Sequence, residues 1–398
     1  MHTHIGDEST KCTTKTITPV TSRKCNDGLN CLFANARSLH SKMGEVEALV
    51  NEENYDIIGI AETWLCSSHD WAVNIPGYAL FRRDRAQRKG GGVCLYVRSD
   101  IKVSMKEDLV DGECDDAEVL WVELYTGTHN TKVIVGVCYR PPGVNEEVET
   151  QLFKQIEMAA KAGTVVLMGD FNYPDIDWKN GTAGTTKGRT FINLLHDNFM
   201  VQFVDTPTRK DALLDLVISN QAELVTNIHI KEHLGNSDHN MISFNLSVKQ
   251  HAHTGKTKTL NFRRANFPML RAALQHIDWE GMFAQKNTEQ KWESFKSVVH
   301  THTEQYIPVS NKFKRLKVKP MWLTSSVKKA IKNKKRAFKI YKDEGTLSSF
   351  ENYKEYNKIC KKEIRIAKIL NEQKVAKECK TNPKKFFKYI NSKKKNPV

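Results

Sequence analysis

Short apolar runs alternate with amphipathic stretches over roughly the first 250 residues of the chain. Apolar runs bounded by glycine, proline or polar residues predict buried strands, and apolar positions spaced three and four apart predict helices. Strands are expected at residues 29–33, 56–61, 93–97, 118–125, 131–139, 165–168, 213–218, 223–230 and 241–248. Helices are expected over residues 39–50 and 148–159 and in the segment that ends near residue 198. Strands with interspersed helices, and no internal repeat, predict one α/β layered domain over residues 28–250.

The pattern changes on either side of this domain. Residues 1–27 are rich in Thr and Lys and lack periodicity, so we expect a disordered leader. Residues 251–262 are polar and turn-like, which is typical of a linker. From residue 263 to residue 398, apolar positions recur at helical spacing, with a helix pair interrupted at Gly345. This last region is therefore predicted to be mainly helical.

The charge of the chain is divided unevenly between these regions. The net charge is +15, but residues 311–398 carry 28 Lys and Arg against 7 Asp and Glu, which leaves the first 310 residues with 33 against 39. The acidic balance of the first 310 residues favours cation binding or catalysis there, and the basic C-terminal region favours binding to a polyanion such as DNA or RNA. The alternative for the basic region is a solvated helical surface.

Several protein classes are excluded by composition. The first ten residues are polar and no apolar run reaches the length of a membrane span, so we expect an intracellular protein with no membrane partner. The nine cysteines include no Cys-x-x-Cys pair, which favours reduced thiols. His229 and His233 match a zinc-protease spacing, but that motif needs a helix, and the alternation of Ile228 and Ile230 predicts a strand.

The strongest chemical signal follows the apolar run at residues 165–168. Gly169 leads from this run into Asp170, Phe171 and Asn172, and the period of two places Asp170 and Asn172 on the same side of the strand. A carboxylate beside an amide suits phosphate-ester chemistry, because Asp can accept a proton or face a metal while Asn donates to a phosphate oxygen. Taken alone, the same residues also fit a strand that ends in a polar turn.

Other polar side chains also lie just past the ends of predicted strands. Loops at one edge of a sheet are where separate residues are gathered into a site. The set contains acid, amide, phenol and imidazole groups, which turns alone do not explain. Its members are Asn35, Glu62, Tyr139, Asp170, Asn172, Asp238 and His239.

Seven short motifs resemble those of the endonuclease/exonuclease/phosphatase superfamily. Their residues are most similar to those of the apurinic-like endonucleases encoded by non-LTR retrotransposons of the jockey and chicken-repeat kind. The resemblance covers residues 28–250 and is specific because the motifs share the family's order. The motifs are Asn35-Ala36-Arg37-Ser38-Leu39, Ile60-Ala61-Glu62-Thr63-Trp64-Leu65, Gly90-Gly91-Gly92-Val93, Tyr139-Arg140-Pro141-Pro142, Gly169-Asp170-Phe171-Asn172, Leu214-Asp215-Leu216-Val217 and Ser237-Asp238-His239.

The resemblance implies a four-layer α/β sandwich followed by a basic helical C-terminal region, and a divalent-metal phosphodiesterase that nicks DNA to leave a 3′-hydroxyl. Glu62 resembles the main ligand for Mg²⁺, or for Mn²⁺ in its place, with Asn35 and Asp238 close to the metal or the phosphate. One Glu with weaker helpers is adequate, since Mg²⁺ keeps several waters and binds substrate phosphate. Such an enzyme would meet chromosomal DNA in the nucleus.

The remaining residues resemble the groups that act on water and phosphate. Asp170 resembles the group that orients or deprotonates the attacking water, and Asn172 resembles a phosphate and water positioner. His239 resembles an imidazole that faces the scissile phosphate and is steered by Asp215, while Tyr139 resembles a phenol beside that phosphate. Whether Asp170 or His239 is the general base stays open at this point.

Two features leave alternatives open. Position 37 is Arg where the abasic-site repair branch has an acid, which argues against a repair role; Arg37 can contact a DNA phosphate or form a surface salt bridge. The C-terminal region resembles the connector between endonuclease and reverse transcriptase, and the sequence ends before any polymerase motif, so a fragment or a retained remnant is implied. The alternative functions are an inactive nucleic-acid-binding remnant and another phosphodiesterase or phosphatase of the superfamily.

Overall fold

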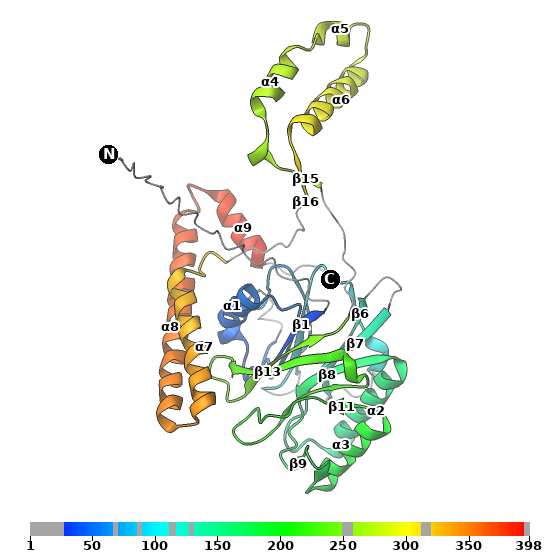
Figure 1. The fold of residues 1–398 in the computed structure, drawn as a ribbon, viewed down its shortest axis with the longest axis vertical. Helices are drawn as coiled ribbons and strands as arrows, with labels where there is room; N and C mark the ends of the chain where they lie inside the picture. The colour runs from blue at the N-terminus through cyan, green and yellow to red at the C-terminus, as the bar shows by residue number, and fades with distance from the viewer. Residues whose placement is uncertain are drawn as a thin grey trace, which may run out of the picture.

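Two six-stranded β-sheets packed face to face form the centre of the protein (Figure 1). The computed structural model describes residues 28–66, 71–85, 90–110, 117–126, 131–248, 258–311 and 320–393. The expected disordered leader, residues 1–27, lies outside the described residues, as does most of the expected linker.

The first sheet has the strand order β13-β14-β1-β2-β4-β3, and the second has the order β11-β12-β8-β7-β6-β5. The first sheet contains β1 (Leu29–Asn35), β2 (Ile57–Ala61), β3 (Tyr78–Arg83), β4 (Val93–Arg98), β13 (Val225–His233) and β14 (Asn240–Leu246). The second contains β5 (Val103–Met105), β6 (Glu118–Thr126), β7 (Thr131–Tyr139), β8 (Thr164–Asp170), β11 (Val201–Gln202) and β12 (Asp215–Ser219).

Each sheet contains one parallel pair, and this decides where the polar residues meet. β1 runs parallel to β2 with Asn35 opposite Ala61, and β7 runs parallel to β8 with Tyr139 opposite Asp170. β12 is antiparallel to β8, so its first residue, Asp215, lies opposite Asp170. β14 is antiparallel to β1 and begins directly after His239. The carboxyl ends of the parallel pairs and the amino ends of β12 and β14 therefore lie at one edge.

Helices cover both outer faces, so the expected four-layer α/β sandwich is confirmed. A short turn, η1 (His40–Lys42), leads into α1 (Met43–Glu53), which covers the first sheet, and α2 (Glu146–Ala162) and α3 (Thr186–Asp197) cover the second (Figure 1). The apolar core between the sheets includes Phe33, Val137 and Met168. Gly59 of the first sheet allows the two sheets to approach closely, because an added Cβ would lie 2.5 Å from the sulfur of Met168 in the second sheet.

Local sequence explains where the covering helices begin. The Asn145 side chain accepts a hydrogen bond from the N–H of Val148 at 2.9 Å and caps α2. The Thr185 hydroxyl does the same for α3 through the N–H of Gly188 at 3.0 Å. Short elements join the rest of the domain: η3 (Glu107–Leu109), β9 (Ile176–Asp177), β10 (Thr182–Ala183) and η4 (Ala222–Leu224).

Three expectations about the whole chain can be compared with the described residues. No helix in the described parts of the chain is both long and apolar enough to cross a bilayer. The described cysteines are free thiols, as expected. His229 and His233 lie on strand β13, which confirms that their spacing is not the helical zinc motif.

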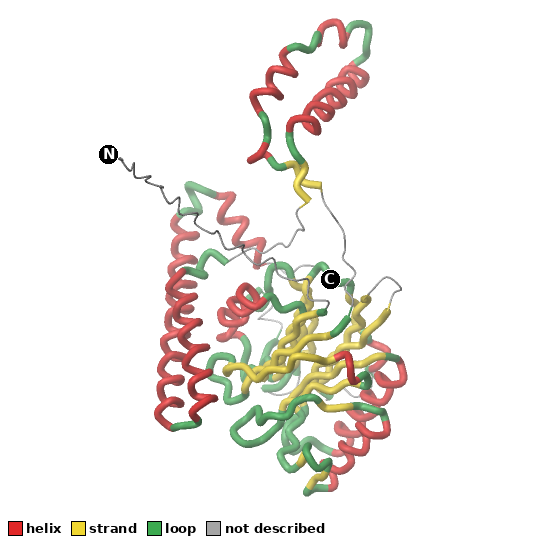
Figure 2. The backbone as a smooth tube through the Cα atoms, viewed as in Figure 1, coloured by secondary structure: helices red, strands yellow, loops and turns green. Residues whose placement is uncertain are grey.

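Residues 258–311 form a unit of their own (Figure 2). β15 (Lys258–Leu260) pairs with β16 (Val309–Asn311), so the segment expected to be linker ends in a short strand. Between these strands lie η5 (Phe262–Arg264), α4 (Phe267–Gln275), α5 (Trp279–Phe283) and α6 (Thr288–Tyr306).

The C-terminal region contains a long helical hairpin that packs against α1 (Figures 1 and 2). It consists of α7 (Ser325–Glu344) and α8 (Leu347–Lys377), followed by α9 (Pro383–Lys393). Gly345 ends α7 with a φ of 65°, which confirms the break expected there. Gly44 lets α8 approach α1 closely, because an added Cβ would lie 2.6 Å from Ile364 Cγ2.

Charged residues join the hairpin to α1 as well. Lys334 is buried, and its Nζ donates to Glu45 Oε2 and to the His233 carbonyl, both at 2.9 Å. Burial lowers the pKa of Lys334, but Glu45, Tyr353 and Glu232 together outweigh burial and raise that pKa. Trp322 Nε1 donates to Glu47 Oε2 at 3.1 Å. Part of the basic C-terminal charge is therefore neutralised within the molecule by acids of α1.

We predict that Lys334→Met lowers the free energy of unfolding by about 3 kcal/mol, because Glu45 would remain buried without its cation. Urea denaturation measures this, and Lys332→Met, an exposed change on the same helix, should stay within about 0.5 kcal/mol of the original protein. Adding Glu45→Gln to Lys334→Met should restore part of the loss. Equal urea midpoints for Lys334→Met and Lys332→Met would contradict the prediction.

Candidate active site

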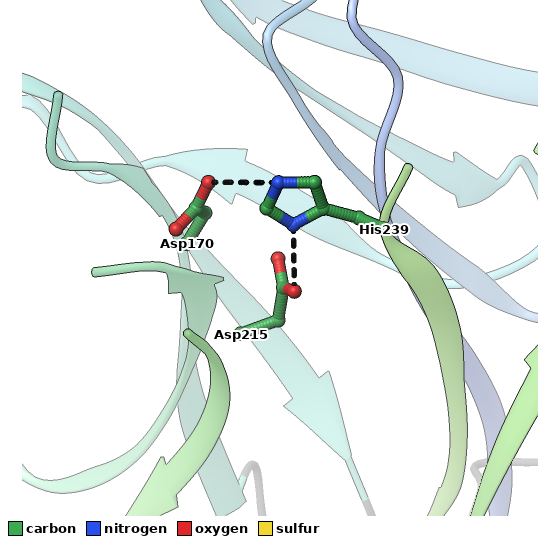
Figure 3. A group of neighbouring side chains, drawn as sticks. All are labelled: Asp170, Asp215 and His239. Atoms are coloured by element: carbon green, nitrogen blue, oxygen red, sulfur yellow. Dashed lines mark hydrogen bonds and ion pairs between the residues drawn. The ribbon is translucent and has the colours of Figure 1, made fainter. Parts of the chain in front are cut away.

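A buried group of two carboxylates and one imidazole lies at the shared edge of the sheets (Figure 3). His239 Nδ1 lies 2.8 Å from Asp215 Oδ2, and His239 Nε2 lies 3.9 Å from Asp170 Oδ2. None of the three side chains is more than 2% exposed. The structure thus brings together three residues that the sequence nominated from distant segments.

Asp215 fixes the orientation and the charge of His239. The backbone N–H of Asp215 donates to Thr208 Oγ1 at 3.1 Å, which anchors the start of β12. With Nδ1 of His239 bonded to Asp215, Nε2 is the ring nitrogen that faces Asp170. Burial lowers the pKa of His239, but the charge and hydrogen bond of Asp215, together with the charges of Asp170 and Asp238, outweigh burial and raise that pKa. The imidazole is therefore favoured in its protonated form.

Asn35 links the carboxylates of the two sheets. Its Nδ2 donates to Glu62 Oε1 at 2.9 Å and to Asp170 Oδ2 at 2.8 Å, and its Oδ1 accepts from the Arg37 N–H at 3.1 Å. The Ser237 hydroxyl donates to the Asn35 carbonyl at 2.7 Å and accepts from the N–H of His239 at 3.2 Å. Both the nitrogen and the oxygen of the buried Asn35 amide thus form hydrogen bonds within the site.

Glu62 sits in a constrained turn after β2. Its Oε2 accepts from Trp64 Nε1 at 3.2 Å, and both residues have positive φ values, 50° and 54°. Such backbone conformations are unfavourable for residues with a Cβ and persist where surrounding contacts impose them. The carbonyls of Gly91 and Gly92 accept from the N–H groups of Trp64 and Thr63 at 2.9 and 3.1 Å. The glycine run therefore supports the turn that carries Glu62.

Asp170 is the group whose protonation is most affected by its surroundings. Burial raises its pKa, and the charge of Asp215 raises it further, against the opposing effects of His239 and Asn35. Asn172, with a φ of 50°, donates its N–H to Asp170 Oδ1 at 3.2 Å. The environment thus gives Asp170 an unusual affinity for a proton or a cation.

Asn172 and Arg140 form a support beneath this carboxylate. Asn172 Nδ2 donates to the Arg140 carbonyl at 2.9 Å, and Arg140 Nη1 donates to the carbonyls of Phe171 and Asn172 at 3.2 and 3.3 Å. Glu149 fixes the buried guanidinium through Arg140 Nε at 2.8 Å. In this arrangement one of the two N–H donors of the Asn172 amide is used within the protein.

Tyr139 ends β7 beside Asp170, as the parallel register requires. Burial raises the pKa of its phenol, and the charges of Glu62 and Asp170 act in the same direction. The Arg85 guanidinium lies 5.8 Å from the centre of the ring and is itself paired with Glu118. Tyr139 therefore stays protonated and is a hydrogen-bond donor.

Asp238 lies at the rim of the site between two arginines. Arg37 Nη1 is 2.9 Å from its Oδ1, and Arg209 Nε is 2.8 Å from its Oδ2. Burial opposes ionisation, but the hydrogen bond from Arg37 and the other nearby positive charges lower the pKa of Asp238 to about 2. Both carboxylate oxygens thus hold arginines, and the salt bridge considered for Arg37 is the arrangement observed.

Several supporting residues are not evident from sequence patterns. Thr208 and Arg209 belong to no motif, whereas Ser237 directly precedes Asp238 and His239 and could have been nominated from that position. Lys42 is buried, and its Nζ donates to the carbonyls of residues 36, 37 and 38 at 2.6, 2.9 and 3.0 Å. A lysine at the start of an amphipathic helix would ordinarily be read as a surface charge.

The residues present fit a hard divalent cation. Glu62 and Asp170 both accept from the amide of Asn35, and Asp215 lies opposite Asp170. Carboxylate oxygens are preferred ligands of Mg²⁺. Asp170, Asp215 and His239 have ligand atoms within 4.8 Å of one another. Since Asp215 and His239 already bond to each other, the half-buried carboxylate of Glu62 is the better position for a cation.

Comparison with known proteins adds a sequence match in the second half of this domain. Residues 133–243 match the family model described as endonuclease-reverse transcriptase. The matched segment runs from β7 into β14 and contains Tyr139, Asp170, Asp215 and His239, whereas Asn35 and Glu62 lie before it. No curated protein matches the chain.

Solved structures with similar folds include nucleases and a phosphatase. The endonuclease domain of TRAS1, a telomere-specific non-LTR retrotransposon, is 17% identical with a TM-score of 0.44; 56% of this chain and 100% of that chain are covered. The AP endonuclease LMAP from Leishmania major is 13% identical with a TM-score of 0.47, covering 55% and 88%. The 3′ phosphatase NExo from Neisseria, bound to a product DNA hairpin, is 14% identical with a TM-score of 0.40, covering 55% and 99%.

We predict that Asp215→Asn lowers the pKa of the His239 imidazole by at least about one unit, because the carboxylate charge that opposes burial is removed. NMR titration of the ring nitrogens measures that pKa directly, with Asp197→Asn, a distant acid at the end of α3, as the control. An unchanged imidazole pKa in Asp215→Asn would show that Asp215 does not hold the charge of His239.

Proposed function

We propose that this chain is a divalent-metal-dependent endonuclease that hydrolyses a phosphodiester bond of DNA and leaves a 3′-hydroxyl. The observation that carries the proposal is the connection of Asp215, His239, Asp170, Asn35 and Glu62 by successive side-chain contacts at one sheet edge. Burying several charged side chains together lowers the stability of a fold. A protein that only binds nucleic acid would not need such a group, whereas an enzyme would.

Glu62, assisted by Asn35, would hold Mg²⁺ or, in its place, Mn²⁺. When bound there, the ion supplies polarisation of the phosphate and stabilisation of the leaving oxygen. Asp238 acts differently in our proposal, because both of its oxygens are paired with arginines. It holds Arg37 and Arg209 at the rim, where they can contact backbone phosphates.

The two buried groups divide the proton and charge chemistry between them. Asp170, with its raised pKa, is the general base that takes a proton from the attacking water. The new P–O bond forms as the P–O3′ bond breaks, and the 3′-oxygen takes a proton from solvent. His239, kept protonated by Asp215, faces the phosphate and stabilises its negative charge. Tyr139 adds a neutral hydrogen-bond donor beside them.

RNA is a second nucleic-acid partner in this proposal. The surplus of Lys and Arg after residue 310 suits any phosphate backbone, and RNA would meet it through the basic C-terminal region. At the catalytic edge of the sheets, the proposed substrate is DNA.

We predict that the protein nicks supercoiled plasmid with Mg²⁺ but not with EDTA. Asp170→Ala and His239→Ala should each lower the nicking rate at least about 100-fold while the DNA dissociation constant changes less than about threefold, because each acts mainly in the transition state. His229→Ala, an exposed change on β13, is the control. Polymerase extension of the nick tests for the 3′-hydroxyl. Nicking in EDTA, or original rates in both catalytic variants, would contradict the proposal.

A further inference from the structure

A row of four exposed cations follows one side of α8. Lys354, Lys358, Lys361 and Arg365 are spaced four, three and four residues apart, which places them on the same side of a helix. At 1.5 Å per residue, the row is roughly 16 Å long. We call these four residues the α8 row. Within the described parts of the chain, none of the four forms an ion pair with an acid.

The α8 row borders the loop that carries the catalytic imidazole. Asn357 Nδ2, next to Lys358 and one turn before Lys361, donates to the Gly235 carbonyl at 2.7 Å. Gly235 belongs to the loop of residues 234–239, which contains Asp238 and His239, and its N–H donates to Glu45 Oε2 at 3.1 Å. The side of α8 that holds the row is therefore adjacent to the side that touches this loop.

Lys42 connects the row to the rim of the site electrostatically. Burial lowers the pKa of Lys42 to about 8, and the charges of Lys361 and Arg37 act in the same direction, against the opposing charge of Glu45. The same ammonium holds the carbonyls of residues 36 to 38, in the loop that follows Asn35. Lys361 and Arg37 thus lie close enough to one buried amine to influence it together.

The position of α8 is fixed by buried contacts. Tyr353, Cys360 and Ile364 are buried on its docked face, and the Tyr353 hydroxyl accepts from the N–H of His233 at 3.2 Å. Lys368 Nζ lies 3.4 Å from Glu47 Oε2 of α1. Because this face is held on the nuclease domain, the α8 row keeps a constant place relative to the catalytic loop.

We propose that the α8 row binds the phosphates of duplex DNA beside the scissile bond, and so extends the substrate path from Arg37 and Arg209 onto the C-terminal hairpin. This inference rests on the proposed nuclease function. A row of this length matches roughly five base pairs of duplex at 3.4 Å each. Regularly spaced cations on a rigid helix suit a regularly charged rod, and they position the duplex without reading its sequence.

The neighbouring helix provides a matched control. Lys328, Lys329, Lys332 and Lys339 of α7 are also exposed and carry the same total charge. Their helix also contacts α1, through Lys335 with Glu52 and Glu53 and through Lys334 with Glu45. Lys334 reaches the His233 carbonyl, but within the described parts of the chain none of the four control lysines forms a side-chain hydrogen bond to residues 233–239. These four lysines therefore test the loss of four positive charges on the other helix of the hairpin.

The test measures binding of a duplex of about 30 base pairs to the full chain in EDTA, at several salt concentrations. Replacing all four cations of the α8 row by Gln should weaken binding at least about tenfold and flatten the dependence of log K on log salt by about 3 to 4 units, at roughly 0.9 per phosphate contact. The α7 quadruple Gln variant should change the slope by less than about one unit. In Mg²⁺, KM for plasmid should rise in the α8 variant and kcat should stay unchanged.

Two double variants keep the test decisive if the quadruple variant unfolds. Lys354→Gln with Lys358→Gln, and Lys361→Gln with Arg365→Gln, should each remove about half of the slope change. Equal slopes for the α7 and α8 quadruple variants, or an unchanged slope in both double variants, would overturn the inference. Because binding is measured without metal, a protein that binds through the row but never nicks would refute the proposed nuclease function alone.

Discussion

The hydrogen bonds of Asn35 are the interaction on which the candidate site depends. Asn35 ends β1 in the first sheet, and its amide reaches Asp170 at the end of β8 in the second sheet. The contact between His239 and Asp215 crosses between the sheets in the same way. The site therefore exists only where the two sheets are packed at the correct offset, and the apolar core between them, including the close contact of Gly59 with Met168, sets that offset. Fold and chemistry are thus linked through a few polar contacts at one edge.

Much of this edge could be predicted from the sequence, because strand ends are marked by local patterns. The apolar run before Gly169 and the Pro141-Pro142 pair after Tyr139 show where β8 and β7 end. Asp215 carried no such signal and was nominated from the family resemblance alone. Ser237, Thr208 and Lys42 act through contacts between distant segments, which periodicity does not report. The short strands β5, β9, β10 and β11 were also missed, since two or three residues show no usable pattern.

The C-terminal region shows a second limit of sequence reasoning. Its helices and the break at Gly345 were predictable from spacing, but its docking on α1 was not. Glu45 and Glu47 look like ordinary charges on a helix surface, and Lys334 looks like one of many solvated lysines. In the structure these residues are buried together, so acids of α1 partly neutralise the basic C-terminal region. Lys354, Lys358, Lys361 and Arg365 remain exposed on α8, next to the side that touches the loop of residues 234–239.

The proposed chemistry depends on a metal ion held by Glu62. The most direct measurement is the Mg²⁺ dependence of plasmid nicking by Glu62→Gln, which keeps the size of the side chain and removes its charge. If Glu62 is a metal ligand, we expect the half-saturating Mg²⁺ concentration to rise at least about tenfold, with DNA binding in EDTA unchanged. An unchanged half-saturating concentration would show that Glu62 is not a ligand and would contradict the account.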